Sequence, residues 1–173
     1  MSDNYVLIGF MGAGKSSVGK MLAEKSGKQF MDTDEMIVKQ MNLSINDIFA
    51  TYGEEYFRDL ETNLVKALSE NVNNAVISVG GGLALREENR MYLKKIGTVV
   101  YLSVNESTVI RRLKGDTSRP LLRGTKEEVK EKVSTLLNAR RPLYEDAAHL
   151  VVKTDRLNKD EIVNRIIEYG SEK

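Results

Sequence analysis

Short apolar runs alternate along the chain with longer segments in which apolar residues recur every three or four positions. The short runs are typical of buried strands, and the longer spacing is typical of amphipathic helices. The pattern predicts strands over 5–8, 29–32, 75–79, 98–102 and 149–152. It predicts helices over 17–25, 36–41, 44–50, 57–71, 87–95, 104–114, 127–138 and 160–169. Strands that alternate with helices in this way imply an α/β protein, with a five-stranded parallel sheet in three α/β/α layers and right-handed crossovers.

The length of the chain, 173 residues, suits a single domain over 1–173. Apolar residues make up 41% and charged residues 29%, and the formal net charge is +1, so bulk charge gives no reason to expect a nucleic acid or membrane partner. No apolar run approaches the roughly 18 residues that a membrane span needs, and no secretory signal is visible. We therefore expect a soluble cytoplasmic protein.

The sequence contains no cysteine and one histidine, which narrows the possible chemistry. Without cysteine, neither a disulfide framework nor a thiolate metal site is possible. The histidine, His149, lies in an apolar stretch at the predicted end of a strand. We interpret it as structural rather than catalytic.

The segment Gly9–Ser16 has the sequence GFMGAGKS, which fits the phosphate-loop pattern G-x-x-x-x-G-K-[ST]. A predicted strand precedes it and a predicted helix follows it. The glycines let the backbone approach a phosphate closely, and the N–H groups at the helix start face the anion. In such a loop Lys15 reaches the outer phosphates, and the hydroxyl of Ser16 can ligate Mg²⁺. The residues predicted to bind the nucleotide here are Gly12, Ala13, Gly14, Lys15, Ser16 and Ser17.

Kinases, ATPases and guanine-nucleotide switches all use such a loop, so other motifs must separate them. No Asp-x-x-Gly sequence occurs in the chain. The segment 158–161 departs from the guanine-reading pattern Asn-Lys-x-Asp because it ends in Glu161. A guanine-nucleotide switch is therefore disfavoured, and we interpret 158–161 as the start of a helix.

Two carboxylates, Asp32 and Asp34, follow the second predicted strand. Ligands of open α/β sheets bind at the carboxyl ends of strands. We expect Asp32 to hold Mg²⁺ through water together with Ser16, and Asp34 to accept the proton of an acceptor hydroxyl as general base. Phosphoryl transfer depends on charge neutralisation and an oriented acceptor, so these groups favour a kinase.

Three consecutive glycines, Gly80, Gly81 and Gly82, follow the third predicted strand. They would let a ligand touch the backbone, although a flexible turn has the same sequence pattern. Arg58 and Arg140 each lie near aromatic residues or proline, and two guanidinium groups that face one cavity suit a carboxylate. Ion pairs and helix ends explain each arginine equally well when it is taken singly. If the two converge, the acceptor is a small hydroxylated acid.

Basic residues gather between 111 and 123, where glycine and proline also occur. We interpret the segment 111–124 as a mobile lid, and a solvated charged loop is the alternative. Arg119 is predicted to close over the transferring phosphoryl group. Closure would exclude water, which competes with the acceptor.

Taken together, these segments resemble the shikimate kinase family over nearly the whole chain. The resemblance is carried by the phosphate loop, by Asp32-Thr33-Asp34 and by the segment 53–61, which fits the family pattern G-E-x-x-F-R-x-x-E. It is completed by Gly80-Gly81-Gly82, by Arg119-Pro120-Leu121-Leu122, and by Arg140 with Pro142-Leu143-Tyr144. The resemblance implies a fold similar to that of nucleoside monophosphate kinases, with strand order 2-3-1-4-5. It also implies a substrate-binding region at about 33–61 and a closing lid.

The activity that this resemblance implies is ATP-dependent phosphorylation of the 3-hydroxyl of shikimate, in aromatic amino acid (chorismate) biosynthesis. The family uses ATP and Mg²⁺ and is usually monomeric. The implied shikimate-binding residues are Asp34, Arg58, Gly80, Gly81, Gly82 and Arg140, with the two arginines on the carboxylate. Glu61 would hold Arg58, and Phe49 and Phe57 would wall the ring.

The resemblance also implies contacts to the nucleotide. Lys15 and Arg119 would contact the phosphates of ATP, and both are expected to serve catalysis together with Asp34. Arg112 would lie over the adenine, and the loop that contains Leu157 would flank its other side.

Two other functions fit part of the pattern. A related small-molecule kinase, such as a gluconate kinase, shares the phosphate loop and an acidic polyol substrate, but should lack the 53–61 motif and the triple glycine. A nucleotide-binding regulatory module would bind ATP without transferring a phosphoryl group to any acceptor.

Overall fold

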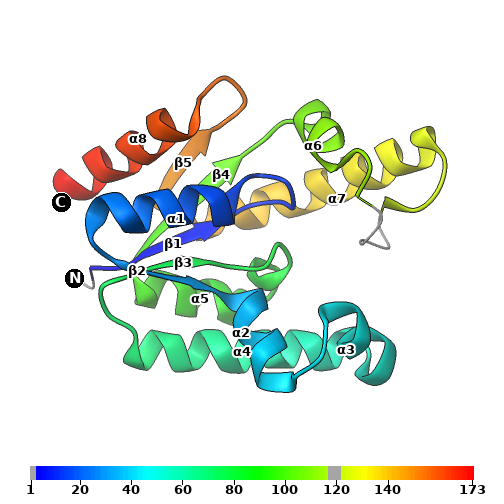
Figure 1. Ribbon diagram of the computed structural model, residues 1–173, viewed down its shortest axis with the longest axis horizontal. Helices are drawn as coiled ribbons and strands as arrows, with labels where there is room; N and C mark the ends of the chain where they lie inside the picture. Colours follow the sequence, from blue (N-terminus) through cyan, green and yellow to red (C-terminus); the bar gives the residue numbers. More distant parts are fainter. Residues whose placement is uncertain (1–2, 117–121) are drawn as a thin grey trace.

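The computed structural model describes residues 3–116 and 122–173 and is built around a five-stranded parallel sheet (Figure 1). The strand order is β2-β3-β1-β4-β5. The strands are β1 (Tyr5–Ile8), β2 (Gln29–Asp32), β3 (Ala75–Ser78), β4 (Thr98–Ser103) and β5 (Leu150–Lys153). The predicted class and strand order are confirmed, and each predicted strand is found within one or two residues of its expected place.

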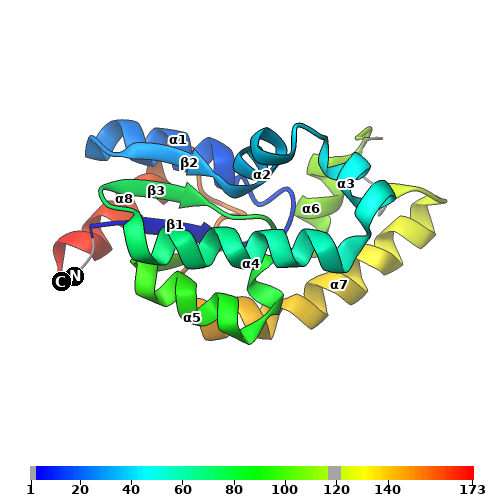
Figure 2. The same cartoon turned by 90° about the horizontal axis from the view of Figure 1, so that it is seen from below.

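Helices cover both faces of the sheet. They are α1 (Lys15–Ser26), α2 (Thr33–Met41), α3 (Ile45–Tyr52), α4 (Glu54–Asn71), the 3₁₀ helix η1 (Leu83–Leu85), α5 (Glu87–Ile96), α6 (Glu106–Leu113), α7 (Lys126–Ala147) and α8 (Lys159–Ser171). Helices α1 and α8 pack side by side, and α4, α5 and α7 lie on the opposite face from α1 (Figures 1 and 2). The three-layer α/β/α arrangement is therefore confirmed.

The central strand residues are apolar without alternation because helices cover both sides of the sheet. Val6, Leu7, Val76 and Ile77 have no exposed surface. Full burial of such a side chain contributes about 1.5–3 kcal/mol. A second apolar cluster joins α2, α3 and α4 away from the sheet and is formed by Ile37, Ile48 and Phe57. The segment 33–61 thus has a small core of its own beside the main one.

Side-chain caps explain where several helices begin. The hydroxyl of Ser44 accepts the N–H of Asp47 at the start of α3. Asn158 and Glu161 form a reciprocal capping box at the start of α8, where the sequence indicated a helix start rather than a guanine-reading motif. Each such cap is worth on the order of 1 kcal/mol.

Helix α7 is longer than predicted. The sequence prediction ended this helix at residue 138, before Pro142, but the helix continues through the proline to Ala147. Pro142 is on the exposed side, and so is Asn138, whose carbonyl loses its helical N–H donor. That carbonyl faces solvent and can be hydrated, so the helix tolerates the proline. The apolar spacing continues on the buried side through Tyr144 and Ala147.

His149 lies just before β5 rather than inside a strand, which corrects the predicted start of that strand. The backbone N–H of His149 donates to the carbonyl of Val99 (2.8 Å), and the ring Nδ1 of His149 accepts the backbone N–H of Val99 (2.9 Å). Burial lowers the pKa of His149, which favours the neutral ring that accepts this bond. The histidine thus extends the pairing of β5 with β4.

The carboxyl ends of the strands face the end of the molecule formed by α2, α3, α6 and the start of α7, and the C-terminus lies at the opposite end (Figure 1). Binding sites of open α/β sheets lie at this edge. None of the helices in the described ranges is long and apolar enough to span a bilayer.

Candidate active site

The loop between β1 and α1 exposes backbone donors at the start of a helix. Gly14 caps α1 with φ +87°, a left-handed conformation that a residue with a Cβ adopts only with strain. The first N–H groups of a helix point out of its N-terminus, and the glycine cap of α1 offers them no side-chain acceptor. Together with the helix dipole, they form an anion-binding position.

Two basic side chains lie along this loop. The Nζ of Lys15 donates to the carbonyls of Gly9 (2.7 Å) and Phe10 (3.0 Å). The Nη1 of Arg112, from α6, donates to the carbonyl of Gly12 (2.9 Å). The loop therefore carries positive charge both at its helix end and beside its glycines.

Asp32 links the start of α1 to the start of α2. One of its carboxylate oxygens accepts the hydroxyl of Ser16 (2.9 Å), and the other caps α2 by accepting the N–H groups of Asp34 (2.9 Å) and Glu35 (3.2 Å). Within the described residues, no three acidic or histidine side chains gather into a cage for a metal. The hydroxyl and carboxylate instead suit Mg²⁺, which keeps several waters and commonly uses one or two protein oxygens with phosphate oxygens.

The glycine run 80–82 is surrounded by charged side chains. A Cβ on Gly80 would lie 2.8 Å from an oxygen of Asp34, and one on Gly82 would overlap the guanidinium of Arg58. A Cβ on Gly81 would lie 3.6 Å from the Nη1 of Arg140. Any side chain on Gly80 or Gly82 would therefore displace a charged group. We call Asp34, Arg58, Arg140 and the three glycines the glycine-run cluster.

A cavity of about 330 Å³ connects the phosphate loop with this cluster. Its lining residues are Met11, Gly12, Gly14, Lys15, Ser16, Ser17, Asp32, Asp34, Ser78, Val79, Gly80 and Gly81. The loop lysine and the Asp34 carboxylate thus face one space, which is the arrangement that transfer from a bound phosphate to a neighbouring acceptor needs.

Arg58 is held by a buried carboxylate one helical turn away. Its Nη1 donates to Glu61 (2.5 Å), and its Nη2 approaches the exposed Glu54 (3.4 Å). Glu61 has no exposed surface, and its second oxygen has no hydrogen-bond partner in the described part of the chain. Burial raises the pKa of Glu61 to about 7, although the charge and hydrogen bond of Arg58 lower it.

Glu61 should make the stability of the protein depend on pH. Its folded pKa is raised, so the folded state binds more protons than the unfolded chain between about pH 4.5 and 7. The stabilising contribution of protonated Glu61 is therefore lost as pH rises through this window, by up to about 3 kcal/mol. From pH 5 to 7, the urea midpoint of the wild type should fall relative to that of Glu61→Gln. Above pH 7, the midpoints of the two proteins should change in parallel.

The matched control is Glu54→Gln, which removes a carboxylate on the exposed side of the same arginine. That variant should keep the pH profile of the wild type. Parallel profiles of wild type and Glu61→Gln from pH 5 to 7 would contradict the raised pKa.

The structure brings together most of the predicted site residues but not all of them. Those that line the cavity or the glycine run are Gly12, Gly14, Lys15, Ser16, Ser17, Asp32, Asp34, Arg58, Gly80, Gly81, Gly82 and Arg140. Ala13 is buried in the loop, and Leu157 is partly buried against the main core in the turn after β5. Arg119 lies outside the described residues. Phe49 and Phe57 pack together, with ring centroids 5.0 Å apart.

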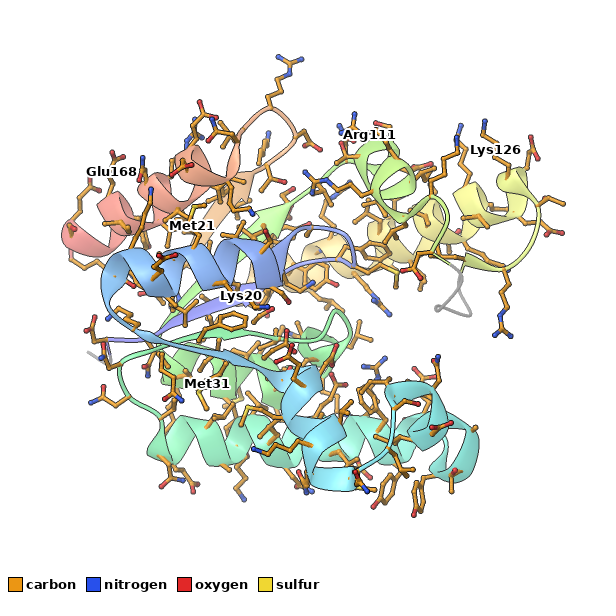
Figure 3. All side chains as sticks on the ribbon, in the orientation of Figure 1. Lys20, Met21, Met31, Arg111, Lys126 and Glu168 are labelled. Carbon is orange, nitrogen blue, oxygen red and sulfur yellow. The ribbon has the colours of Figure 1, made fainter. Side chains whose placement is uncertain are left out.

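The predicted lid is described in part. Residues 111–116 and 122–124 flank a segment that lies outside the described ranges. Figure 3 labels Arg111 on α6 and Lys126 near the outer tip of α7, and both are exposed. Leu113 of α6 packs on the phosphate loop at Gly12.

Sequence reasoning assigned no role to two residues that contact the glycine run. The hydroxyl of Thr33, which is fully buried, accepts the N–H of Gly80 (3.0 Å). The hydroxyl of Tyr144 donates to the carbonyl of Gly81 (2.5 Å). Tyr144 lies four positions after Arg140, and this spacing would have shown that both share a helix face had the helix not been predicted to end at 138.

Comparison with known proteins identifies one family. The family model described as shikimate kinase matches residues 11–170. A shikimate kinase of Thermodesulfovibrio yellowstonii is 43% identical over 165 residues, which cover 95% of this chain and 93% of that protein. One of Geobacter sulfurreducens is 40% identical over 169 residues, which cover 98% of this chain and 91% of that protein.

Solved structures give the same result. The shikimate kinase of Acinetobacter baumannii in complex with shikimate has a TM-score of 0.90 and 35% identity, over 98% of this chain and 93% of that one. The shikimate kinase of Aquifex aeolicus has a TM-score of 0.80 and 38% identity, over 95% of this chain and 94% of that one.

Proposed function

We infer that this chain, which belongs to the shikimate kinase family, transfers the terminal phosphoryl group of ATP to the 3-hydroxyl of shikimate. This step yields shikimate 3-phosphate in aromatic amino acid biosynthesis. The observation that carries the inference is the meeting of Asp34, Arg58 and Arg140 around three glycines, beside the lysine of the phosphate loop. The related shikimate kinase of Acinetobacter baumannii was solved in complex with shikimate.

The acid is proposed to bind in the glycine-run cluster. Arg58 and Arg140 take its carboxylate, because guanidinium forks bind carboxylates through paired hydrogen bonds. Glycine at positions 80 and 82 lets the Asp34 carboxylate and the Arg58 guanidinium lie close to the backbone, since a Cβ there would collide with them. Phe49 and Phe57 wall the apolar side of the ring.

Asp34 is proposed as the general base. Its carboxylate accepts the proton of the 3-hydroxyl while the hydroxyl oxygen attacks the terminal phosphorus and the bond to ADP breaks. In support, Asp34 lines the same cavity as Lys15. A base that lies close to both the hydroxyl and the phosphate can accept the proton while the hydroxyl oxygen attacks, without a rearrangement of the bound groups.

The nucleotide is proposed to bind along the phosphate loop. The backbone of Gly12–Ser17 and the ammonium of Lys15 neutralise the phosphates. Ser16 and, through water, Asp32 would hold Mg²⁺, which supplies charge neutralisation between the phosphates when bound. The adjacent hydroxyl and carboxylate, 2.9 Å apart, form a donor set that fits this ion.

Other parts of the chain are proposed to complete the nucleotide site. Arg112 covers one side of the adenine, and Leu157 flanks the other. Arg119, within a lid at about 111–124, closes over the phosphates and excludes water. We further propose that the chain is one kinase domain that acts as a monomer in the cytoplasm, without nucleic acid or membrane partners.

Coupled measurement of ADP release tests the proposed function. With ATP and Mg²⁺, shikimate should raise ADP release far above the rate without an acceptor, and phosphorus NMR should place the new phosphate on the 3-oxygen. Gluconate should not raise it. Turnover with gluconate alone would favour the alternative kinase, and ATP binding without turnover on either acid would favour a regulatory module.

A further inference from the structure

The glycine run is fixed from two sides by buried hydroxyl groups. Thr33, which directly precedes Asp34, accepts the N–H of Gly80 (3.0 Å). Tyr144, which lies one helical turn after Arg140, donates to the carbonyl of Gly81 (2.5 Å). The same backbone segment therefore connects the start of α2 with the last turns of α7. These are the two elements that carry Asp34 and Arg140.

The hydrogen bond of Tyr144 to Gly81 lies inside the protein. The residue is only 1% exposed, so its hydroxyl and the Gly81 carbonyl have little access to water. Burial raises the pKa of Tyr144 to about 12, against the lowering effect of the Arg140 guanidinium, so the hydroxyl keeps its proton at neutral pH. A protonated phenol is the form that donates to a carbonyl.

Arg140 lacks the buried ion pair that holds Arg58, and its side chain interacts with the hydroxyl of Tyr144 one turn along the same helix. Arg58 is paired with the buried Glu61, whereas the Nε of Arg140 is buried without a hydrogen-bond partner among residues 3–116 and 122–173. The Arg140 guanidinium lies 5.6 Å from the ring centroid of Phe10 in the phosphate loop. A shift of this turn of α7 would therefore move Arg140 relative to both the loop and the glycines.

We propose that Tyr144 is a positioning residue for the acid substrate: its bond to Gly81 holds Arg140 beside the glycine run, which Asp34 also borders. The inference rests on the proposed function and assigns a role to a residue that does not itself line the cavity. It acts through Gly81 and Arg140, so it should set the affinity for the acid and leave the chemical step nearly unchanged.

Tyr101 on β4 provides a matched control. Its ring packs on that of Tyr144, with centroids 5.1 Å apart, and it is also 1% exposed. Its hydroxyl has no hydrogen-bond partner within the described ranges. Removal of this hydroxyl therefore changes a neighbouring tyrosine in the same environment without breaking the contact to Gly81.

The test compares Tyr144→Phe with Tyr101→Phe. We expect Tyr144→Phe to raise the KM and the dissociation constant for shikimate about 5- to 20-fold, because one buried hydrogen bond is lost. The kcat should stay within about twofold, and the KM for ATP should not change. Tyr101→Phe should leave all these constants unchanged. Melting temperatures report whether each variant is folded.

Replacement of Tyr144 by 4-aminophenylalanine, which keeps a donor at the ring tip, should restore most of the shikimate affinity. An unchanged shikimate KM in Tyr144→Phe, an equal rise in the KM for ATP, or no recovery with 4-aminophenylalanine would each overturn the proposal. Failure of the proposed function appears instead in the wild type, which would then neither bind shikimate in calorimetry nor phosphorylate it.

Discussion

Replacement of Asp34 by asparagine is expected to lower kcat for shikimate phosphorylation by about 100- to 10,000-fold, the usual range for loss of a general base. The amide keeps the size of the side chain but cannot accept the proton of the hydroxyl. Affinity for ATP should be unchanged, because the proposed contacts to the nucleotide come from the phosphate loop and not from Asp34. Steady-state kinetics and calorimetric titration with an ATP analogue measure the two effects separately.

Glu35→Gln is the matched control for this substitution. Glu35 is the next residue of α2, carries the same charge and is exposed. Its amide variant should retain the kcat of the wild type. A kcat for Asp34→Asn within tenfold of the wild type would remove Asp34 from proton transfer. A large loss of nucleotide affinity in Asp34→Asn would show instead that the main role of Asp34 is to bind ATP.

The sheet and the phosphate loop could be predicted because each is encoded by a contiguous pattern. The apolar run that includes Val76 and Ile77 has no polar alternation, which indicates a strand covered on both faces, and both residues are fully buried. The loop before Lys15 is likewise recognisable from eight neighbouring residues. Local sequence of this kind leaves few structural alternatives.

The glycine-run cluster could not be predicted from local pattern, because its three charged members come from helices far apart in the chain and meet at the loop after β3. The motif order and the family resemblance suggested that Arg58 and Arg140 meet, but an ion pair on the surface would have produced the same residues. Tyr144 and Gly81 are separated by 63 positions, and only the tertiary fold brings them together. The predicted end of the helix at 138 was wrong, because α7 continues through Pro142, which lies on its solvent side where a proline is tolerated.

Alanine at either arginine of the cluster is expected to raise the KM for shikimate strongly. Loss of one partner of a buried charged hydrogen bond costs about 2–5 kcal/mol, which corresponds to roughly 30- to 4,000-fold in affinity. Arg141→Ala is the control, because it removes the same charge from the residue next to Arg140. It should leave the KM for shikimate near that of the wild type. Initial-rate measurements over a wide range of shikimate concentrations check this.

The two arginine variants should differ in stability. Above pH 7, where Glu61 is ionised in the wild type, Arg58→Ala removes the cation paired with this buried carboxylate, so we expect a lower urea midpoint there as well as a higher KM. Arg140→Ala removes no ion pair found among the described residues, and its urea midpoint should fall less.

A double variant separates these two effects. Arg58→Ala combined with Glu61→Gln removes the stranded charge and should regain much of the lost stability above pH 7. Its KM for shikimate should remain as high as that of Arg58→Ala, because no guanidinium is restored. Recovery of the KM together with the stability would mean that Arg58 acts only by neutralising Glu61, and that the carboxylate of the acid is held by other groups.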